Sequence, residues 1–271
     1  MPELPEVETT VRGLARYLEG ERLEQVALAR PDMRFPFPAG LVQSLTGARV
    51  TGLGRRAKYG LIHTDREDTM VFHLGMSGRW RIDPEELGKH DHLVLETAAH
   101  GFALNDPRRF GFVDLVRTAE LEGWPPFAAM GPEPLGPAFT AQHLKAALGG
   151  RKQAIKLLLL DQRIVAGLGN IYVCEALWRA GISPRKAAGK VSLASLERLV
   201  AGVRTVLAEA IEAGGSTLRD FAGPDGELGY FSKRFDVYGR EGASCRRGDD
   251  GTVRRIVQGG RSTWYCPRCQ H

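Results

Sequence analysis

The feature that most constrains this fold is a change in hydrophobic periodicity near the middle of the chain. Between about residues 21 and 117, short runs typical of β-strands alternate with Gly, Pro, Asn and Asp; examples are Leu61–Thr64, Met70–His73 and His92–Glu96. Many short strands at this spacing predict a sandwich or barrel. After residue 137, apolar residues recur at helical intervals instead. The sequence therefore predicts an α+β protein with its strands and helices segregated.

The chain also begins with a predicted helix, because Val7, Val11, Leu14 and Leu18 mark one apolar helical face. Pro5 suits its first turn, and Gly20 suits its end. Further helices are expected over residues 140–148, 153–160, 171–179 and 193–213. The last of these has Ser192 as its predicted N-cap, and Gly214-Gly215 end it.

These patterns divide the chain into four predicted regions. Residues 1–118 form an N-terminal β-sandwich that carries the first helix, and residues 119–137 are a Pro-rich linker. Residues 138–232 form a helical domain, and residues 233–271 form a tail of β-like pieces that bears three cysteines.

Composition and charge favour a cytosolic protein with an anionic partner. The formal charge is +5, and from Lys233 to Arg261 eight Lys or Arg face four Asp or Glu. No stretch approaches the roughly 18 uncharged apolar residues of a membrane span. The N-terminus carries Glu3, Glu6 and Glu8, the wrong charge for a secretory signal.

The first six residues, Met1-Pro-Glu-Leu-Pro-Glu6, permit two interpretations. Proline in the first turn of a helix costs nothing, because its missing N–H has no partner there. Alternatively, removal of Met1 would leave Pro2 as a terminal secondary amine close to the carboxylates of Glu3 and Glu6. Such an amine is partly unprotonated at neutral pH and attacks sugar or carbonyl carbons to form Schiff bases.

The cysteines of the tail indicate a metal site. Cys266-Pro-Arg-Cys269 has the spacing of zinc ribbons and knuckles, but upstream Cys245 is followed by Arg-Arg-Gly instead of a second matching cysteine. The fourth ligand would come from Asp249, Asp250 or His271; alternatively, the tail is a hairpin without metal. Cys174 is expected to be buried in a helix, outside the site.

Three turns contain residues suited to DNA. Gly75–Gly78 presents Met76, and Asp106–Gly111 presents cationic and aromatic side chains that can wedge between base steps. A Met or Phe in a β domain can equally be a core residue. Gly167–Asn170 leads into a helix N-terminus, which suits a phosphate or merely connects two helices.

Taken together, motifs along the whole chain resemble bacterial formamidopyrimidine-DNA glycosylase, the enzyme that removes 8-oxoguanine, in the family that also contains endonuclease VIII. They run in the family's order: residues 1–9, 55–59, 73–78, 90–92, 105–111, 131–135, 165–172, 214–221, 237–242 and 260–266.

The resemblance implies a bifunctional DNA glycosylase and apurinic/apyrimidinic lyase of base excision repair. In it Pro2 is the nucleophile and Glu3 the acid that protonates the sugar ring oxygen. Lys58 serves proton transfer in β-elimination, and Arg261 serves δ-elimination. The implied fold joins the N-terminal sandwich to a helical domain with a helix–two-turn–helix motif and a zinc-finger-like hairpin.

The resemblance also implies a set of DNA contacts. His90, Arg108, Lys152 and Asn170 match positions that contact DNA. Met76, Arg108 and Phe110 match side chains that fill the gap left by an extruded nucleotide, and Arg109 lies between the last two. The segment Arg219–Phe231 resembles the loop that closes over extruded 8-oxoguanine. With Leu4, this segment favours oxidised purines over the oxidised pyrimidines preferred by endonuclease VIII.

The implied partner is double-stranded DNA with oxidised bases or abasic sites, bound by a monomer in the bacterial cytosol and nucleoid. The implied cofactor is one zinc ion per chain. The missing cysteine is a departure from the family pattern, so two versions of the finger stay open. Either Cys245, Asp249, Cys266 and Cys269 hold zinc, or the finger keeps its DNA role without metal. The alternative functions are an endonuclease VIII-like glycosylase that acts on oxidised pyrimidines and a non-catalytic protein that binds damaged DNA.

Overall fold

The computed structural model describes residues 2–216 and 229–271. The chain forms two units: Met1–Ala128 with Ala213–Ser232, and Ala129–Glu212 with Lys233–His271. Among the described residues, no helix combines the length and apolar character that a bilayer span requires.

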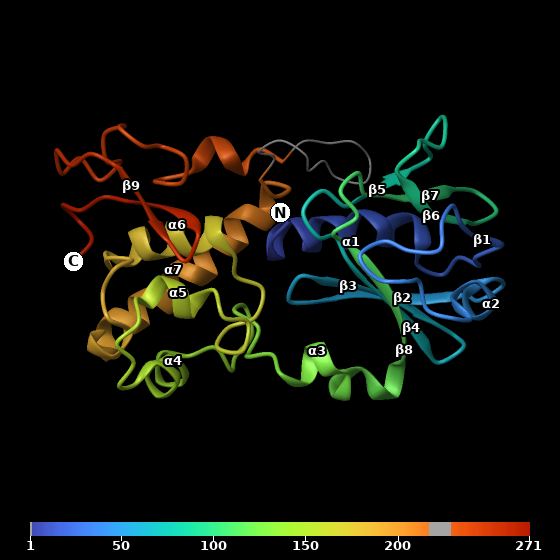
Figure 1. Cartoon of the computed structure of the whole chain (residues 1–271), viewed down its shortest axis with the longest axis horizontal. Helices are drawn as coiled ribbons and strands as arrows, with labels where there is room; N and C mark the ends of the chain where they lie inside the picture. Colours follow the sequence, from blue (N-terminus) through green and yellow to red (C-terminus); the bar gives the residue numbers. More distant parts are fainter. Residues whose placement is uncertain (1, 217–228) are drawn as a thin grey trace. The chain divides into compact units, whose positions relative to one another are not determined.

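Two antiparallel four-stranded sheets and a long helix build the first unit (Figure 1). One sheet has the order β1 (Gln25–Leu28), β6 (Asp91–Glu96), β7 (Gly101–Asn105), β5 (Arg79–Ile82). The other has the order β2 (Val50–Arg56), β3 (Tyr59–Thr64), β4 (Asp68–His73), β8 (Phe112–Arg117). Helix α1 (Leu4–Leu18) packs against β2, β3 and β5, and the short α2 (Leu41–Leu45) precedes β2.

The core of this unit joins the buried face of α1 to side chains of both sheets. Val7, Val11, Leu14 and Leu18 lie in one cluster with residues of the first sheet such as Trp80 and Leu104, and of the second such as Phe72. The predicted sandwich with its N-terminal helix is therefore confirmed. Helix α1 starts at Leu4, directly before Pro5, and Gly20 follows its end with a φ of +85°.

Part of the predicted linker is folded onto the second sheet. The 3₁₀ helix η1 (Thr118–Gly123) and α3 (Pro125–Ala128) occupy its first half. Proline is tolerated at the first position of α3 because the N–H that it lacks would have no acceptor within the helix there. The Trp124 and Phe127 rings lie 5.6 and 5.4 Å from the ring of Tyr59 on β3, so aromatic packing holds this stretch.

Helices make up most of the second unit. They are α4 (Ala141–Leu148), α5 (Ile155–Leu159), α6 (Asn170–Ala180), η2 (Ala188–Lys190) and α7 (Leu193–Glu212). The 3₁₀ helix η3 (Phe231–Arg234) begins in the first unit and ends in the second. Helix α5 starts later than the predicted residue 153, because Ala154 pairs with Ala187 in an antiparallel bridge. Helix α7 agrees with its prediction: the Ser195 N–H donates to Ser192 Oγ at 3.3 Å.

The tail ends in the hairpin β9 (Arg254–Gln258) and β10 (Arg261–Tyr265). Its two turn residues, Gly259 and Gly260, have φ values of +55° and +72°. Positive φ at both positions is the requirement of a tight two-residue hairpin turn, and glycine meets it without strain. The turn sets Arg261, which is exposed, at the start of β10.

Candidate functional site

The N-terminal segment is buried although it is polar. Pro2 is buried, and Glu3 is only 3% exposed where α1 begins. The Glu3 N–H donates to Glu6 Oε2 at 2.8 Å, so the first turn of the helix holds the backbone next to Pro2. A proline and a carboxylate therefore lie side by side in a site with little water. Met1 lies outside the described residues.

Lys58 lies in the two-residue turn between β2 and β3 and is 8% exposed. Its neighbour Ala57 has a φ of +53°, a conformation that residues other than glycine rarely adopt. Strained backbone of this kind costs roughly 1–3 kcal/mol and is concentrated at functional sites. Positive φ is also what a tight two-residue hairpin turn requires, so the turn places Lys58 at the end of this hairpin, and its chemical role stays a prediction.

His73, at the end of β4, is a site residue to which the sequence analysis assigned no role. Burial, with a smaller effect of the cationic Lys58 and Arg34, lowers the pKa of His73 from 6.5 to about 4. Its Nδ1 accepts the Gly75 N–H at 3.0 Å, so the proton of the neutral ring is on Nε2. His73 is thus a neutral hydrogen-bond donor in an electropositive part of the site.

The loops that carry Met76 and Arg108–Phe110 are joined by the fully buried carboxylate of Asp106. Asp106 Oδ1 accepts the Ser77 hydroxyl at 2.6 Å, and Oδ2 accepts the Gly111 N–H at 2.8 Å. The two loops abut so closely that a Cβ at Gly75 would lie 2.3 Å from the Gly111 nitrogen. The structure therefore brings together the residues predicted to fill the gap in DNA.

These loops present a cation and apolar groups to solvent. Phe110 is 44% exposed and Met76 37%, and the Arg108 guanidinium lies 4.7 Å from the centre of the Phe110 ring. Arg109, with a φ of +55°, lies 3.7 Å from Asp32. A pocket of about 510 Å³ is lined by Asp32, Met33, Arg34, Arg108, Arg109 and Phe110. Exposed apolar side chains beside arginines are the features of a wedge that enters base steps.

His90 lies behind the same loop. It is half-buried, and its carbonyl oxygen accepts the Asp106 N–H at 2.9 Å. The neighbouring His92 ring Nε2 lies 2.9 Å from the Asp106 carbonyl oxygen. The predicted DNA contacts of the first unit therefore share one anchor, Asp106.

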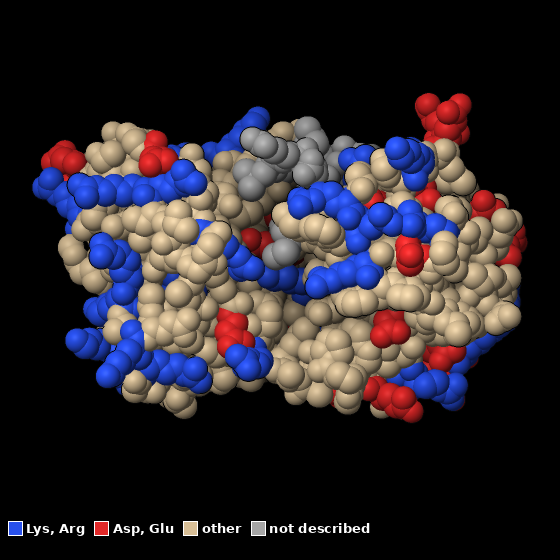
Figure 2. Space-filling view, viewed as in Figure 1, with Lys and Arg blue, Asp and Glu red and all other residues tan. Residues whose placement is uncertain are grey.

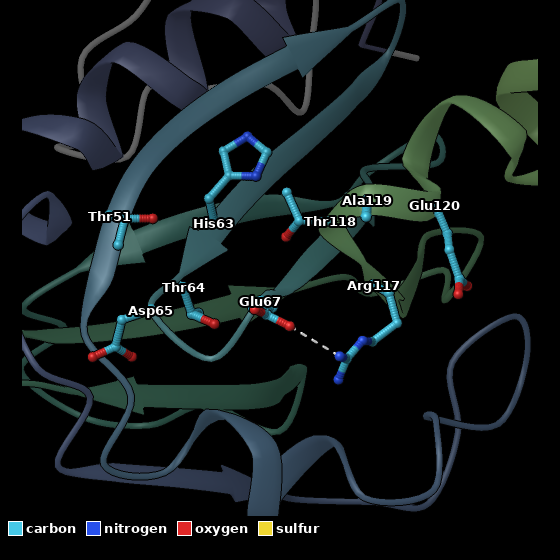
Figure 3. A pocket seen from close by; sticks show the side chains of 9 residues that line it. All are labelled: Thr51, His63, Thr64, Asp65, Glu67, Arg117, Thr118, Ala119 and Glu120. Atoms are coloured by element: carbon cyan, nitrogen blue, oxygen red, sulfur yellow. Dashed lines mark hydrogen bonds and ion pairs between the residues drawn. The ribbon is translucent and has the colours of Figure 1, made fainter.

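A larger pocket of about 580 Å³ lies elsewhere in the first unit (Figure 3). It is lined by Thr51, His63, Thr64, Asp65, Glu67, Arg117, Thr118, Ala119 and Glu120. Arg117 pairs with Glu67 at 3.0 Å, as the dashed line in Figure 3 shows. None of the predicted site residues lines this pocket, so its size alone does not make it the site.

In the second unit, two polar side chains hold the hairpin that carries Arg261. The buried Lys156 Nζ donates to Thr263 Oγ1 at 2.7 Å, and Asn170 Nδ2 donates to the Ser262 carbonyl oxygen at 2.9 Å. Asn170, predicted to bind phosphate, is the first residue of α6. Lys152 is exposed shortly before α5. The sequence analysis missed Lys156, whose only signal was a charge within an apolar run.

The cysteines of the tail meet as predicted, outside its two strands. The ligand atoms of Cys245, Asp249, Cys266 and Cys269 all lie within 4.8 Å of one another. Cys245 Sγ lies 3.8 Å from Cys269 Sγ, which is about the edge of a tetrahedron with zinc–sulfur bonds of about 2.3 Å. Buried Cys174 belongs to α6 and lies outside this cluster, as expected.

Asp249 is oriented toward the thiols. Its Oδ1 accepts the Gly251 N–H at 2.9 Å, and Oδ2 lies 3.6 Å from Cys266 Sγ. The Gly251 N–H lowers the pKa of Asp249, which favours the charged ligand form. A Cβ at Gly251 would lie 2.5 Å from Cys266 Sγ, so this cradle requires glycine. The residues present fit one zinc ion.

Three family models match this chain: the formamidopyrimidine-DNA glycosylase N-terminal domain over residues 1–113, its H2TH domain over 130–222, and the zinc finger found in FPG and IleRS over 250–271. The chain belongs to the formamidopyrimidine-DNA glycosylase family. The zinc-finger match starts after Asp249, so Cys245 and Asp249, half of the cluster, lie before it.

Full-length relatives agree with this family. Formamidopyrimidine-DNA glycosylases of Erythrobacter litoralis and Novosphingobium aromaticivorans are 72% and 70% identical, each covering 100% of both chains. A Lactococcus lactis FPG variant solved in complex with Fapy-dG-containing DNA is 33% identical with a TM-score of 0.92, covering 100% of both chains. MutM (FPG) of Thermus thermophilus is 40% identical with a TM-score of 0.89, covering 99% of this chain and 98% of that one.

Proposed function

We propose that this protein is a bifunctional DNA glycosylase and apurinic/apyrimidinic lyase that excises oxidised purines, including 8-oxoguanine and formamidopyrimidines, from double-stranded DNA. The observation that carries the proposal is the burial of Pro2 and Glu3 in a member of this family that matches a relative over 100% of both chains. The solved relative bound to Fapy-dG-containing DNA supports the purine class of lesion.

The proposed chemistry starts at Pro2 once Met1 has been removed. The lone pair of the secondary amine attacks the anomeric carbon as the glycosidic bond breaks. The damaged base leaves with the electron pair of that bond and takes up the proton that the amine nitrogen releases. Glu3 protonates the ring oxygen as the sugar opens, which leaves an iminium ion. We assign this proton transfer to Glu3 because it is buried next to Pro2 at the start of α1.

Strand cleavage follows from the iminium ion, which is an electron sink. The proton on the adjacent carbon becomes acidic, and its loss expels the 3′ phosphate by β-elimination. We assign proton transfer in this step to Lys58. A second proton loss then expels the 5′ phosphate by δ-elimination, which we assign to Arg261. The guanidinium fork suits contact with a phosphate leaving group.

The remaining predicted residues would bind the DNA. Extruding a nucleotide costs roughly a few kcal/mol, and Met76, Arg108 and Phe110, with Arg109, would fill the gap. His90, Lys152 and Asn170 would contact the backbone. The segment Arg219–Phe231 is proposed to bind the extruded base, although residues 217–228 of the chain lie outside the described ranges. We propose that the chain has four functional regions: the catalytic sandwich of residues 1–118, the linker of 119–137, the helical domain of 138–232 and the finger of 233–271.

A zinc ion in the finger would be structural. Cys245, Asp249, Cys266 and Cys269 would hold it, and the bound ion would stabilise the fold of the residues that lead to the hairpin. The substrate places the protein with the chromosome, so we infer that it acts in the bacterial cytoplasm, as a monomer.

Covalent trapping tests the proposal. Borohydride reduces the iminium ion, so Met1-processed protein is expected to form a stable adduct with an 8-oxoguanine duplex. Pro2→Gly, which keeps a terminal amine but makes it primary and flexible, is expected to weaken trapping by about 100-fold. Binding without an adduct would leave only a damaged-DNA-binding protein. Preferential trapping on oxidised-pyrimidine duplexes would refute the purine assignment.

A further inference from the structure

A carboxylate outside the proposed chemistry connects the N-terminus to a distant part of the first unit. Glu6, in the first turn of α1, is 2% exposed. Its Oε2 accepts the Glu3 N–H at 2.8 Å, and its Oε1 accepts both the N–H and the hydroxyl of Ser216 at 2.8 Å. Ser216 is 210 residues away in the sequence.

Ser216 belongs to a short two-stranded stem. It pairs with Tyr230 in an antiparallel bridge, and the Phe231 N–H donates to the Gly215 carbonyl oxygen at 3.1 Å. Gly215 has a φ of +82°, and a Cβ there would lie 3.3 Å from Glu6 Cγ. The stem therefore approaches α1 at a position that only glycine occupies without strain.

The hydrogen bond from the Glu3 N–H to Glu6 acts directly on Pro2. A terminal residue has one covalent neighbour, so the position of its amine depends on the planar Pro2–Glu3 peptide group and on rotation about the Pro2 Cα–C bond. The Glu3 N–H is the one donor of that peptide group, and Glu6 holds it. Because an ionised carboxylate only accepts, Glu6 satisfies the donors of the terminus and the stem at the same time.

We propose that Glu6 is a positioning residue that fixes the Pro2 amine for attack and couples it to the stem of residues 213–216 and 229–231. This inference rests on the proposed function, in which Pro2 is the nucleophile. Glu6 acts through the Pro2–Glu3 peptide group and does not touch the reacting atoms. The simpler interpretation, that Glu6 only caps α1, predicts a loss of stability without a selective loss of chemistry.

Three variants separate these interpretations. Glu6→Gln keeps the volume but turns an NH₂ group toward one set of N–H donors, so one connection is lost. Ser216→Ala removes one hydrogen bond and leaves the Ser216 N–H. Glu19→Gln makes the same chemical change at an exposed residue directly after α1 and is the matched control.

The measurement is the single-turnover rate of borohydride trapping on abasic-site DNA, together with the Kd for an uncleavable abasic analogue. Glu6→Gln is expected to lower the trapping rate by about 100-fold, and Ser216→Ala by about tenfold. Both are expected to keep the Kd within about threefold of wild type and to keep the shape of the pH–rate profile. Glu19→Gln is expected to match wild type throughout.

The possible failures are distinct. If wild-type protein forms no adduct, the proposed function is wrong and this inference is wrong with it. If wild type traps and Glu6→Gln traps equally well, only the inference is wrong. A parallel loss of Kd, trapping and Tm would show a structural cap instead. Loss of one limb of the pH–rate profile would make Glu6 a proton donor or acceptor rather than a positioning residue.

Discussion

In the first unit, buried carboxylates hold the backbone segments that carry the residues with proposed roles. Glu6 accepts from Glu3 and Ser216, and Asp106 accepts from Ser77 and Gly111. Leaving buried donors like these without a partner costs about 1–3 kcal/mol each, so the anchors are as important for geometry as the reacting groups.

At the scale of single residues, His73 predicts how the free energy of unfolding depends on pH. Its pKa is 6.5 in the unfolded chain and about 4 in the folded one, so the unfolded state binds more protons between these values. The contribution of neutral His73 to the stability of the folded protein is fully present above pH 6.5 and is lost as the pH falls to about 4. Wild type should therefore lose about 3 kcal/mol more than His73→Gln on acidification from pH 7 to 4.

Chemical denaturation of both proteins at several pH values measures this difference. Carboxylates that titrate in the same range are common to the two proteins and cancel in the comparison. Glutamine keeps an acceptor for the Gly75 N–H, so the variant retains that contact. Equal losses of free energy of unfolding in the two proteins would contradict a buried, neutral His73.

At the scale of elements, polar contacts attach the tail to the helices at several points. Glu175 of α6, fully buried, accepts the N–H groups of Asp236, Val237 and Tyr238 at 2.8–2.9 Å. Burial raises the pKa of Glu175, and these three donors oppose that rise. Lys156 and Asn170 attach the hairpin at its other end. Arg261 is therefore presented by a hairpin that α5 and α6 hold in place.

The finger gives a prediction about metal binding. Purified protein is expected to contain one zinc ion, and Asp249→Ala should weaken zinc binding by roughly 100-fold because one of four ligands is lost. The matched control is Asp250→Ala, since the Asp250 side chain is 90% exposed and outside the cluster. Metal analysis and competition with a chelator measure both. Active protein without stoichiometric zinc would establish the metal-free finger instead.

For the whole molecule, charge is divided unevenly between the two units. Residues 129–212 with 233–271 carry 20 Lys or Arg and 10 Asp or Glu, whereas the rest of the chain carries 17 and 22. On the face of the second unit that Figure 2 draws, Lys and Arg side chains are widespread. The mild excess of the whole sequence therefore hides a strongly basic unit, which suits contact with the DNA backbone.

This division predicts a steep dependence of DNA affinity on salt. Each phosphate neutralised contributes about −0.9 to the slope of log K against log salt concentration, so affinity should fall by orders of magnitude between about 50 and 200 mM salt. Lys152→Ala should make the slope shallower by about one, whereas Arg117→Ala, at an exposed arginine of the acidic unit that pairs with Glu67, should not. Fluorescence anisotropy across salt concentrations measures these slopes, and a flat dependence would exclude binding through phosphates.

The sequence by itself determined the features that depend on local chemistry. Helix α1 follows from four apolar residues between Pro5 and Gly20, and the Cys266–Cys269 pair follows from its spacing. Strand and helix segregation follows from periodicity, because periods of two and of 3.6 residues bury different faces. The family motifs identified Pro2, Lys58 and Arg261 as candidates, but gave no reason for their geometry.

Only the tertiary structure decided which distant groups meet. Nothing in the local pattern chooses Asp249 over Asp250 as the fourth ligand; the Gly251 N–H and the path of the chain do. The loops that carry Met76 and Phe110 are held together by Asp106, and the first residues of the chain are linked to Ser216 by Glu6. Hydrogen bonds between residues far apart in the chain leave no periodic signal, because their partners become neighbours only after the core has packed.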